Sequence, residues 1–248
     1  SSIEETMVGL RQFGSGQKGL ISIGLLSSVA RNLLPAASEK LSEKFPEIEL
    51  DILEISPKEA IDLLYGRQLS VAVLAEDSIA KSILSFSKTN LFEDPYVLAV
   101  PKSVSLENIK SLEDLKSSPV RKALSNIIQF EFGNQHKKRI EEWFTSVLPN
   151  SKVFAKTRTY EVALSMVQSG RGVAVIPALA ARLSGNLDFD VNLYRTNLPV
   201  RKIVSLIPSQ YIRVEPYKSF IETLSDSGKN IKLPKIHKVP PILESLSL

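Results

Sequence analysis

The chain has 248 residues, 43% of them hydrophobic and 23% charged, a composition typical of one large globular domain or two small ones. It contains no cysteine and only two histidines, which excludes disulfides and thiolate catalysis and disfavours most metal and hydrolase chemistry. We therefore expect no metal and no cofactor. No apolar run reaches the roughly 18 residues of a membrane span, so we also expect no membrane segment.

The formal net charge of +4 is concentrated near the C-terminus. Residues 229–248 hold four lysines and one glutamate, so residues 1–228 are nearly neutral. Such a body lacks the basic footprint of a DNA-binding surface. The chain starts at Ser1 without a signal-peptide pattern, which predicts an excised piece of a cytoplasmic protein.

Residues 3–13 predict a short helix with one apolar stripe, formed by Ile3, Met7 and Leu10. The glycine-rich stretch 14–19 then spells GxGxxG. That dinucleotide-binding motif requires a strand before it and a helix after it, and here the order is reversed. We therefore interpret residues 14–19 as a linker.

From Leu20 onward, apolar strand-like runs alternate with amphipathic helical patterns. The first set comprises strands at 20–26, 48–55 and 71–75 and helices at 29–45 and 57–66. Strands alternating with helices predict a parallel sheet with right-handed crossovers.

The same alternation restarts after extended segments at 83–86 and 96–100 and a polar connection at 102–118. The second set comprises strands at 126–130, 153–155 and 173–176, helices at 135–148 and 160–168, a last strand at 203–207, a helix at 216–224 and an extended tail at 232–248. Two α/β units therefore share one chain, and open α/β folds bind small ligands in the crevice at the carboxyl ends of their strands.

Polar residues follow the ends of predicted strands. Ser27 and Ser28 precede the helix 29–45, where free backbone N–H groups and the helix dipole favour an anion; simple N-capping is the alternative. Ser56 is a weaker candidate. The equivalent place in the second unit holds Thr157, Arg158, Thr159 and Tyr160. There a solvated arginine and an ordinary threonine cap are the alternatives.

A third candidate group, Gln129, Phe130 and Glu131, ends the first strand of the second unit. Gln129 and Glu131 lie on the same side of an extended chain, so one of them is expected to line the cleft. Glu131 either favours an ammonium-bearing ligand or pairs with Arg121 or Lys122.

Five ordered segments carry a resemblance to a known family. They are GLISIG at 19–24, LLP at 33–35, FPEIEL at 45–50, RIEEWF at 139–144 and VQSGRGVAVIP at 167–177. Together they resemble the effector-binding domain of LysR-type transcriptional regulators over residues 19–225.

This resemblance implies an α/β fold of the periplasmic-binding-protein type (type 2), with two Rossmann-like subdomains joined by hinge strands near 97–101 and 200–208. The implied division is 1–16 as the end of a linker helix and linker, 17–101 plus 203–228 as subdomain I, 102–202 as subdomain II and 229–248 as a basic tail. It also implies a small-molecule effector between the subdomains, such as an organic anion or amino acid, a homodimer or tetramer, and DNA binding through an N-terminal domain absent from this chain.

Two other classes of protein share this architecture. A solute-binding protein of a transporter is the first alternative, and the apolar stripe at residues 3–10 argues against it. An enzyme acting on small acids is the second, and the lack of a convincing acid/base cluster argues against that. The sequence therefore favours a sensing domain that binds its ligand without turnover.

Overall fold

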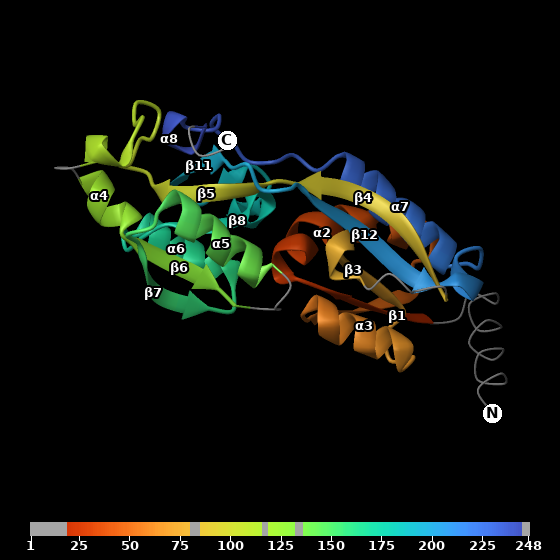
Figure 1. Cartoon of the computed structure of the whole chain (residues 1–248). Coiled ribbons are helices and arrows are strands. Elements are labelled where there is room, and N and C mark those ends of the chain that lie inside the picture. The colour runs from red at the N-terminus through yellow and green to blue at the C-terminus, as the bar shows by residue number, and fades with distance from the viewer. Residues whose placement is uncertain (1–18, 80–84, 116–118, 132–135, 245–248) are drawn as a thin grey trace. The chain divides into compact units, whose positions relative to one another are not determined.

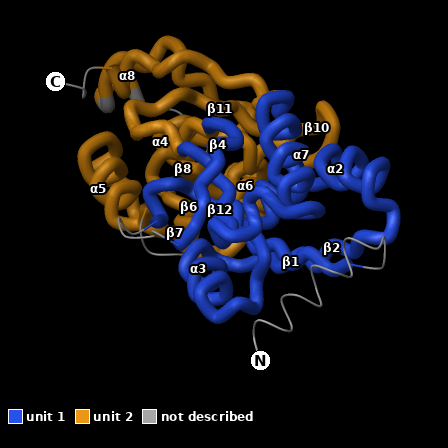
Figure 2. The backbone as a smooth tube through the Cα atoms, turned by 90° about the vertical axis from the view of Figure 1, so that its right-hand side faces the viewer, with its two compact units in different colours: residues 1–93, 202–231 blue, residues 94–201, 232–248 orange. Residues whose placement is uncertain are grey.

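The fold is that of a computed structural model, which describes residues 19–79, 85–115, 119–131 and 136–244. The chain divides into two compact units, shown in different colours in Figure 2: residues 1–93 with 202–231 form unit 1, and residues 94–201 with 232–248 form unit 2. The chain passes between the units after Glu93, after Arg201 and after Ile231. Each core is therefore completed by a segment from far along the chain.

Unit 1 combines one sheet with three described α-helices (Figure 1). Its elements are β1 (Gly19–Leu25), α2 (Ser27–Lys44), β2 (Ile48–Glu54), α3 (Pro57–Tyr65), β3 (Val71–Ala75), the 3-10 turn η1 (Glu76–Ser78), β4 (Phe86–Asp94), β12 (Arg201–Pro208), η4 (Ser209–Tyr211) and α7 (Tyr217–Lys229). The strand order is β2-β1-β3-β12-β4. β1 is parallel to both of its neighbours, β2 and β3, whereas β12 is antiparallel to β3. The strand that returns from unit 2 thus lies inside the sheet.

Alternate residues of this sheet face two different helix layers. Val71 and Val73 of β3 pack in the core beneath α2 and α7, whereas Ala72 and Leu74 pack against α3. A strand buried on both faces shows a continuous apolar run, which is why the sequence identifies β3 so readily.

Unit 2 contains several shorter sheets. Its elements are β5 (Tyr96–Pro101), η2 (Leu112–Leu115), α4 (Pro119–Leu124), β6 (Asn126–Phe130), α5 (Lys137–Val147), β7 (Lys152–Thr157), α6 (Tyr160–Gln168), β8 (Ala174–Pro177), η3 (Ala178–Ala181), β9 (Arg182–Ser184), β10 (Leu187–Asp188), β11 (Val191–Arg195) and α8 (Pro241–Glu244). β5 lies at the centre of the antiparallel sheet β11-β5-β8, β9 pairs with β10, and β6 is parallel to β7.

Val173, just before β8, joins two of these sheets. Its N–H donates to the Asn126 carbonyl at 2.9 Å, and its carbonyl accepts from the Ile128 N–H at 2.8 Å. A Cβ on the neighbouring Gly172 would lie 2.5 Å from the Asn126 carbonyl oxygen. This close backbone approach therefore requires glycine.

The expected α/β alternation is confirmed in both units, and the main differences concern polar strands. The sequence predicts nothing at β9 to β11, whose short segments lack a continuous apolar run. The extended segment predicted at 83–86 reaches β4 only at Phe86, and residues 83–84 lie outside the described residues. The predicted helix at 3–13 and the linker up to residue 18 lie outside the described residues. Within the described ranges, no helix is both long and apolar enough to cross a bilayer.

The C-terminal segment also differs from the extended tail that the sequence predicts. His237 forms two backbone hydrogen bonds with β11, of 2.8 and 3.0 Å, and its ring stacks on Tyr194 with 5.0 Å between centroids. Ile242 and Leu243 are buried in the same core as Trp143. The apolar pair at 242–243, which a solvated tail does not need, was the missed signal.

We expect Leu243→Ala to destabilise unit 2 by about 3 kcal/mol, because a buried leucine loses both transfer free energy and packing. Leu187→Ala is the matched control: Leu187 lies in the same unit but is 62% exposed, so its truncation should change stability by less than about 0.5 kcal/mol. Urea unfolding followed by Trp143 fluorescence measures both. Equal midpoints for the two variants would show that the C-terminal segment is not packed in the core.

Candidate functional site

The start of α2 differs from the sequence prediction. The helix begins at Ser27 and its N-cap is Leu26, which offers no side-chain cap, so the capping interpretation of Ser27 and Ser28 is wrong. Ser28 is 0% exposed, and its hydroxyl has no hydrogen-bond partner among the described residues. A buried polar group beside the positive dipole end of a helix gains from a polar or anionic ligand.

Ser56 has a structural role at the start of α3. Its hydroxyl accepts from the Glu59 N–H at 3.2 Å, and the Glu59 carboxylate accepts from the Ser56 N–H at 2.9 Å. This reciprocal capping box satisfies two backbone donors. The hydrogen bond from the Ser56 N–H also lowers the pKa of the Glu59 carboxyl. Ser56 is thus accounted for as a cap.

Gln129 and Glu131 are engaged within unit 2. The buried Gln129 donates to the Glu141 carboxylate at 2.8 Å. Glu131 pairs with Lys137 at 2.7 Å and Lys156 at 3.4 Å. Glu131 therefore pairs with basic side chains as predicted, but they are Lys137 and Lys156 and not Arg121 or Lys122.

The two lysines determine the charge at this corner of unit 2. The Lys137 hydrogen bond holds the pKa of the Glu131 carboxyl below its usual range, so the carboxylate stays ionised at neutral pH. Glu141 also lies 4.0 Å from Lys137, so two carboxylates face two lysines at this corner. The charges of this corner are therefore balanced.

Phe130 and Tyr160 form an aromatic stack between β6 and α6. Their ring centroids are 3.8 Å apart and the planes differ by 19°. Tyr160 is the first residue of α6 and is 8% exposed. The stack therefore fixes the helix start against the strand end.

The other residues at this helix start are more exposed. The Thr159 hydroxyl accepts from the Val162 N–H at 3.3 Å and caps α6, as the alternative interpretation predicted. The Thr157 hydroxyl accepts from the Thr159 N–H at 3.3 Å. Arg158 is exposed to solvent. Since Phe130 pairs with Thr157 across the β6–β7 ladder, unit 2 brings its predicted residues together.

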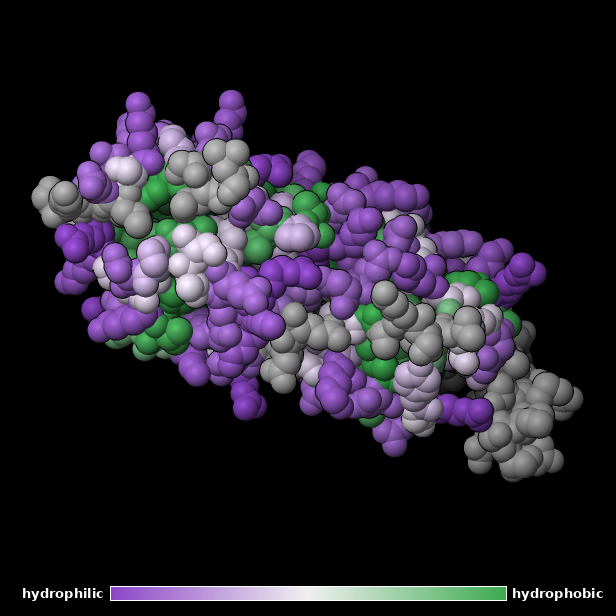
Figure 3. Space-filling model, viewed as in Figure 1, coloured by the Kyte–Doolittle hydropathy of each residue, from purple (hydrophilic) through white to green (hydrophobic). Residues whose placement is uncertain are grey.

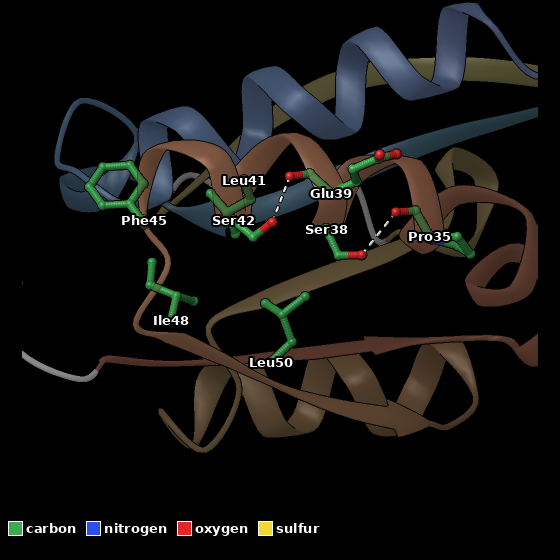
Figure 4. A pocket seen from close by; sticks show the side chains of 8 residues that line it. All are labelled: Pro35, Ser38, Glu39, Leu41, Ser42, Phe45, Ile48 and Leu50. Atoms are coloured by element: carbon green, nitrogen blue, oxygen red, sulfur yellow. Dashed lines mark hydrogen bonds between the residues drawn. The ribbon is translucent and has the colours of Figure 1, made fainter.

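A surface groove elsewhere in unit 1 lies between α2 and β2 and has a volume of about 290 Å³ (Figure 4). Pro35, Leu41 and Phe45 line it from the helix, and Ile48 and Leu50 from the strand side. It contains none of the predicted site residues. In the described ranges, no cluster of His, Asp or Glu side chains is arranged to hold a metal ion.

Unit 2 contains a buried ion pair that was not predicted from the sequence. Arg201 donates to the Asp94 carboxylate at 2.9 Å, and the two side chains are 4% and 0% exposed. The available signal was a pair of opposite charges, each directly beside an apolar run. Because those runs are separated by about a hundred residues, their pairing is invisible along the chain.

A fold of two α/β units, with polar groups at strand ends and helix starts, is typical of domains that bind small ligands. The model of the LysR substrate binding domain matches residues 14–229, and the chain belongs to this family. Its relatives are transcriptional regulators, so it is the effector-binding domain of such a regulator rather than an enzyme or a solute-binding protein.

The similarity extends over most of the chain at low identity. A probable RuBisCO transcriptional regulator of Phaeodactylum tricornutum is 22% identical, over 92% of this chain and 73% of that protein. The reduced form of OxyR from N. meningitidis superposes with a TM-score of 0.62 at 20% identity, covering 85% of this chain and 96% of that one. The BenM effector-binding domain with its effector benzoate superposes with a TM-score of 0.61 at 19% identity, covering 87% of this chain and 95% of that one.

Ser56→Ala and Ser28→Ala should change the free energy of unfolding in different ways. Ser56→Ala should lower the free energy of unfolding by about 1 kcal/mol, because a cap is lost. Ser28→Ala should leave it unchanged or raise it, because a buried hydroxyl without a partner is removed. Chemical unfolding followed by circular dichroism measures the stability of both variants, which carry the same substitution in the same unit. An equal loss for both would mean that the Ser28 hydroxyl is hydrogen-bonded in solution.

Proposed function

We propose that this domain senses a small organic anion, and that its candidate binding residues are Ser27 and Ser28 of unit 1 and the group Gln129, Phe130, Glu131, Thr157, Arg158, Thr159 and Tyr160 of unit 2. The single observation that carries the proposal is the buried Ser28 hydroxyl without a partner in the first turn of α2. A carboxylate at that position accepts from the Ser28 hydroxyl and is stabilised by the positive end of the helix dipole.

The charge of the unit 2 group supports an acid over an amine. The Glu131 and Glu141 carboxylates are balanced by Lys137 and Lys156, and Arg158 adds an exposed cation beside Thr157. Benzoate is the effector named for the similar BenM domain. A carboxylate is accordingly the class of effector that we propose for this chain.

Thiol redox sensing is disfavoured as the mode of response. The similarity to a reduced form of OxyR raises that alternative. This chain has no cysteine, and the thiolate is the group that reacts in thiol oxidation. Ligand binding therefore remains the mode that these residues support.

We expect a carboxylic acid to stabilise the wild-type domain and Ser28→Ala to weaken its binding about tenfold, the effect of one lost hydrogen bond of roughly 1–2 kcal/mol. Thermal shifts with benzoate and a panel of mono- and dicarboxylates identify the acid, and calorimetry measures its Kd. Thr159→Ala should weaken binding as well, but it also lowers the melting temperature of the empty domain because Thr159 caps α6.

Ser42→Ala is the matched control for Ser28→Ala. Ser42 lies on the same helix, is exposed and donates to the Glu39 carbonyl of its own helix at 2.7 Å, so its removal should leave the Kd unchanged. An unchanged Kd for both Ser28→Ala and Thr159→Ala would move the site elsewhere. Stabilisation by amines and by no acid would contradict the proposed effector class.

The whole regulator extends beyond this domain in our proposal. DNA binding is assigned to an N-terminal domain outside this chain, in keeping with the near-neutral charge of residues 1–228. The cytoplasm is the proposed location, where a transcription regulator meets both DNA and metabolites.

We also propose that the domain forms a homodimer. The apolar side chains of α2 that pack in the unit 1 core are not available to a second copy. Two strands with no partner on one side among the described residues offer exposed apolar side chains: β2 exposes Ile52, and β7 exposes Val153 and Phe154. Figure 3 shows hydrophobic side chains over β7 within a mostly hydrophilic face.

The charges along these two strands are complementary. Exposed carboxylates of Glu49, Asp51 and Glu54 surround Ile52 on β2, whereas Lys152 and Lys156 flank the apolar pair on β7. The β2 edge of one copy therefore matches the β7 edge of a second copy, and two equivalent contacts close a two-fold dimer.

Sedimentation should show a dimer of the 27.4 kDa chain at tens of micromolar, and Phe154→Glu should shift it to monomer, because a carboxylate replaces an apolar contact next to the partner's acidic strand. Leu187→Glu, at a similarly exposed apolar position outside β2 and β7, should leave the dimer intact. A wild-type monomer at this concentration would refute the homodimer.

A further inference from the structure

Residues 231–240 run as an extended segment between α7 and α8 (Figure 1). Lys232, Lys235 and Lys238 are exposed, and every other residue of the segment is half-buried or buried. A repeat of three residues is the period of the polyproline II helix, and proline, present at 234 and 240, fixes φ close to the value of that helix. The three lysines therefore share one side of the segment, which we call the lysine row.

The rest of the segment is held in place. Pro234 and Pro240 are buried, and Val239 packs against the core that contains Trp143. The two backbone hydrogen bonds of His237 with β11 fix the middle of the segment. A segment that is already ordered loses less conformational entropy on binding than a disordered tail does. The lysine row is therefore a preformed surface of unit 2, to which residues 232–248 belong.

The lysine row is not neutralised by ion pairs within the part of the chain that the structure describes. Residues 227–243 contain no aspartate or glutamate, and none of the three lysines forms an ion pair with a described carboxylate. Glu107 approaches the segment, but its carboxylate meets the ring of His237, at 3.1 Å. By contrast, Lys138 lies 3.8 Å from Glu142 on its own helix. The row therefore presents three positive charges to an anionic partner.

The spacing of the row fits an extended polyanion. With a rise of about 3.1 Å per residue, a period of three separates neighbouring lysines by about 9 Å and extends the row over about 19 Å. Successive phosphates of one DNA strand are about 3.4 Å apart along the helix axis, so the row covers about six of them. Each lysine can then meet a different phosphate, whereas a small anion contacts one lysine at a time.

We infer that Lys232, Lys235 and Lys238 bind the phosphate backbone of duplex DNA without sequence preference, as a weak contact in addition to that of the N-terminal domain. An acidic protein surface fits less well, because lysine is depleted at protein–protein interfaces, where aromatic residues are enriched, and the segment exposes nothing but lysine. The domain belongs to a transcriptional regulator, and DNA is the polyanion that such a protein meets. The inference goes beyond the proposed function and depends on neither the effector nor the homodimer.

The test measures fluorescence anisotropy of two labelled duplexes of unrelated sequence with the full chain, from about 50 to 200 mM salt. Each lysine bound to a phosphate adds about 0.9 to the slope of log affinity against log salt, so three lysines add about 2.7. We expect the affinity of the wild-type chain to fall about 40-fold over this range, equally for both duplexes. Lys232→Gln/Lys235→Gln/Lys238→Gln should weaken binding at the lowest salt by about tenfold or more and remove most of this slope.

Lys40→Gln/Lys122→Gln/Lys218→Gln is the matched control, because it removes three exposed lysines on α2, α4 and α7 and lowers the net charge by the same amount. It should bind both duplexes as the wild-type chain does. Equal weakening by the two triple variants would show that net charge alone matters and would overturn the inference, as would a wild-type chain that binds neither duplex. Binding of polyglutamate through the row, without binding of DNA, would assign the row to an acidic protein and overturn it as well.

Discussion

The insertion of β12 between β3 and β4 is the constraint on which the rest of the structure depends. Until residues 201–208 arrive, β3 lacks its second neighbour and β4 lacks the neighbour that joins it to the sheet. Such non-local pairing must first overcome the entropy of closing a loop of about a hundred residues. Folding of the intervening residues into unit 2 shortens that effective loop. Unit 2 in turn stays incomplete until the segment after Ile231 returns to β11. The two cores are thus interdependent through connectivity, although each has its own hydrophobic cluster.

The segments that cross between the units must be held firmly, because they determine the register of the strands that they join. Asp94 and Arg201 hold these segments by a buried ion pair, which is more selective for one arrangement than an apolar contact is. An apolar residue tolerates several neighbours, whereas a buried carboxylate tolerates few arrangements other than one that pairs it and satisfies its oxygens. Leu179 contributes the third contact from η3. The pair therefore contributes more to the specificity of the crossing than to net stability, since burial of two charges offsets much of their attraction.

The sequence predicted those parts of the fold whose signal is local. β3 and β5 are buried on both sides and appear as unbroken apolar runs, and α3 carries both a proline start and a capping box. β9 to β11 escaped prediction because their pairing depends on β5 and on one another. At the candidate site the strand-end positions were predictable, but the partners were not. Glu131 meets Lys137 from the start of α5 and Lys156 from β7, and only the folded chain brings those two lysines to one carboxylate.

α2 begins at Ser27, two residues before the start that the sequence predicts, and this difference bears on function. Residue preference places a cap at Ser28, and α3 and α6 do begin with Ser56 and Thr159 as side-chain caps. At α2 the chain instead begins the helix after Leu26, which forgoes about 1 kcal/mol of capping. Asn32 donates to the Ser28 carbonyl at 2.8 Å, so the acceptor side of this turn is engaged while the Ser28 hydroxyl is not. Local rules are most often broken at functional sites. In the proposed site, a ligand that contacts this helix start binds the folded domain and not the unfolded chain, and this preference is what makes ligand binding raise the stability of the domain.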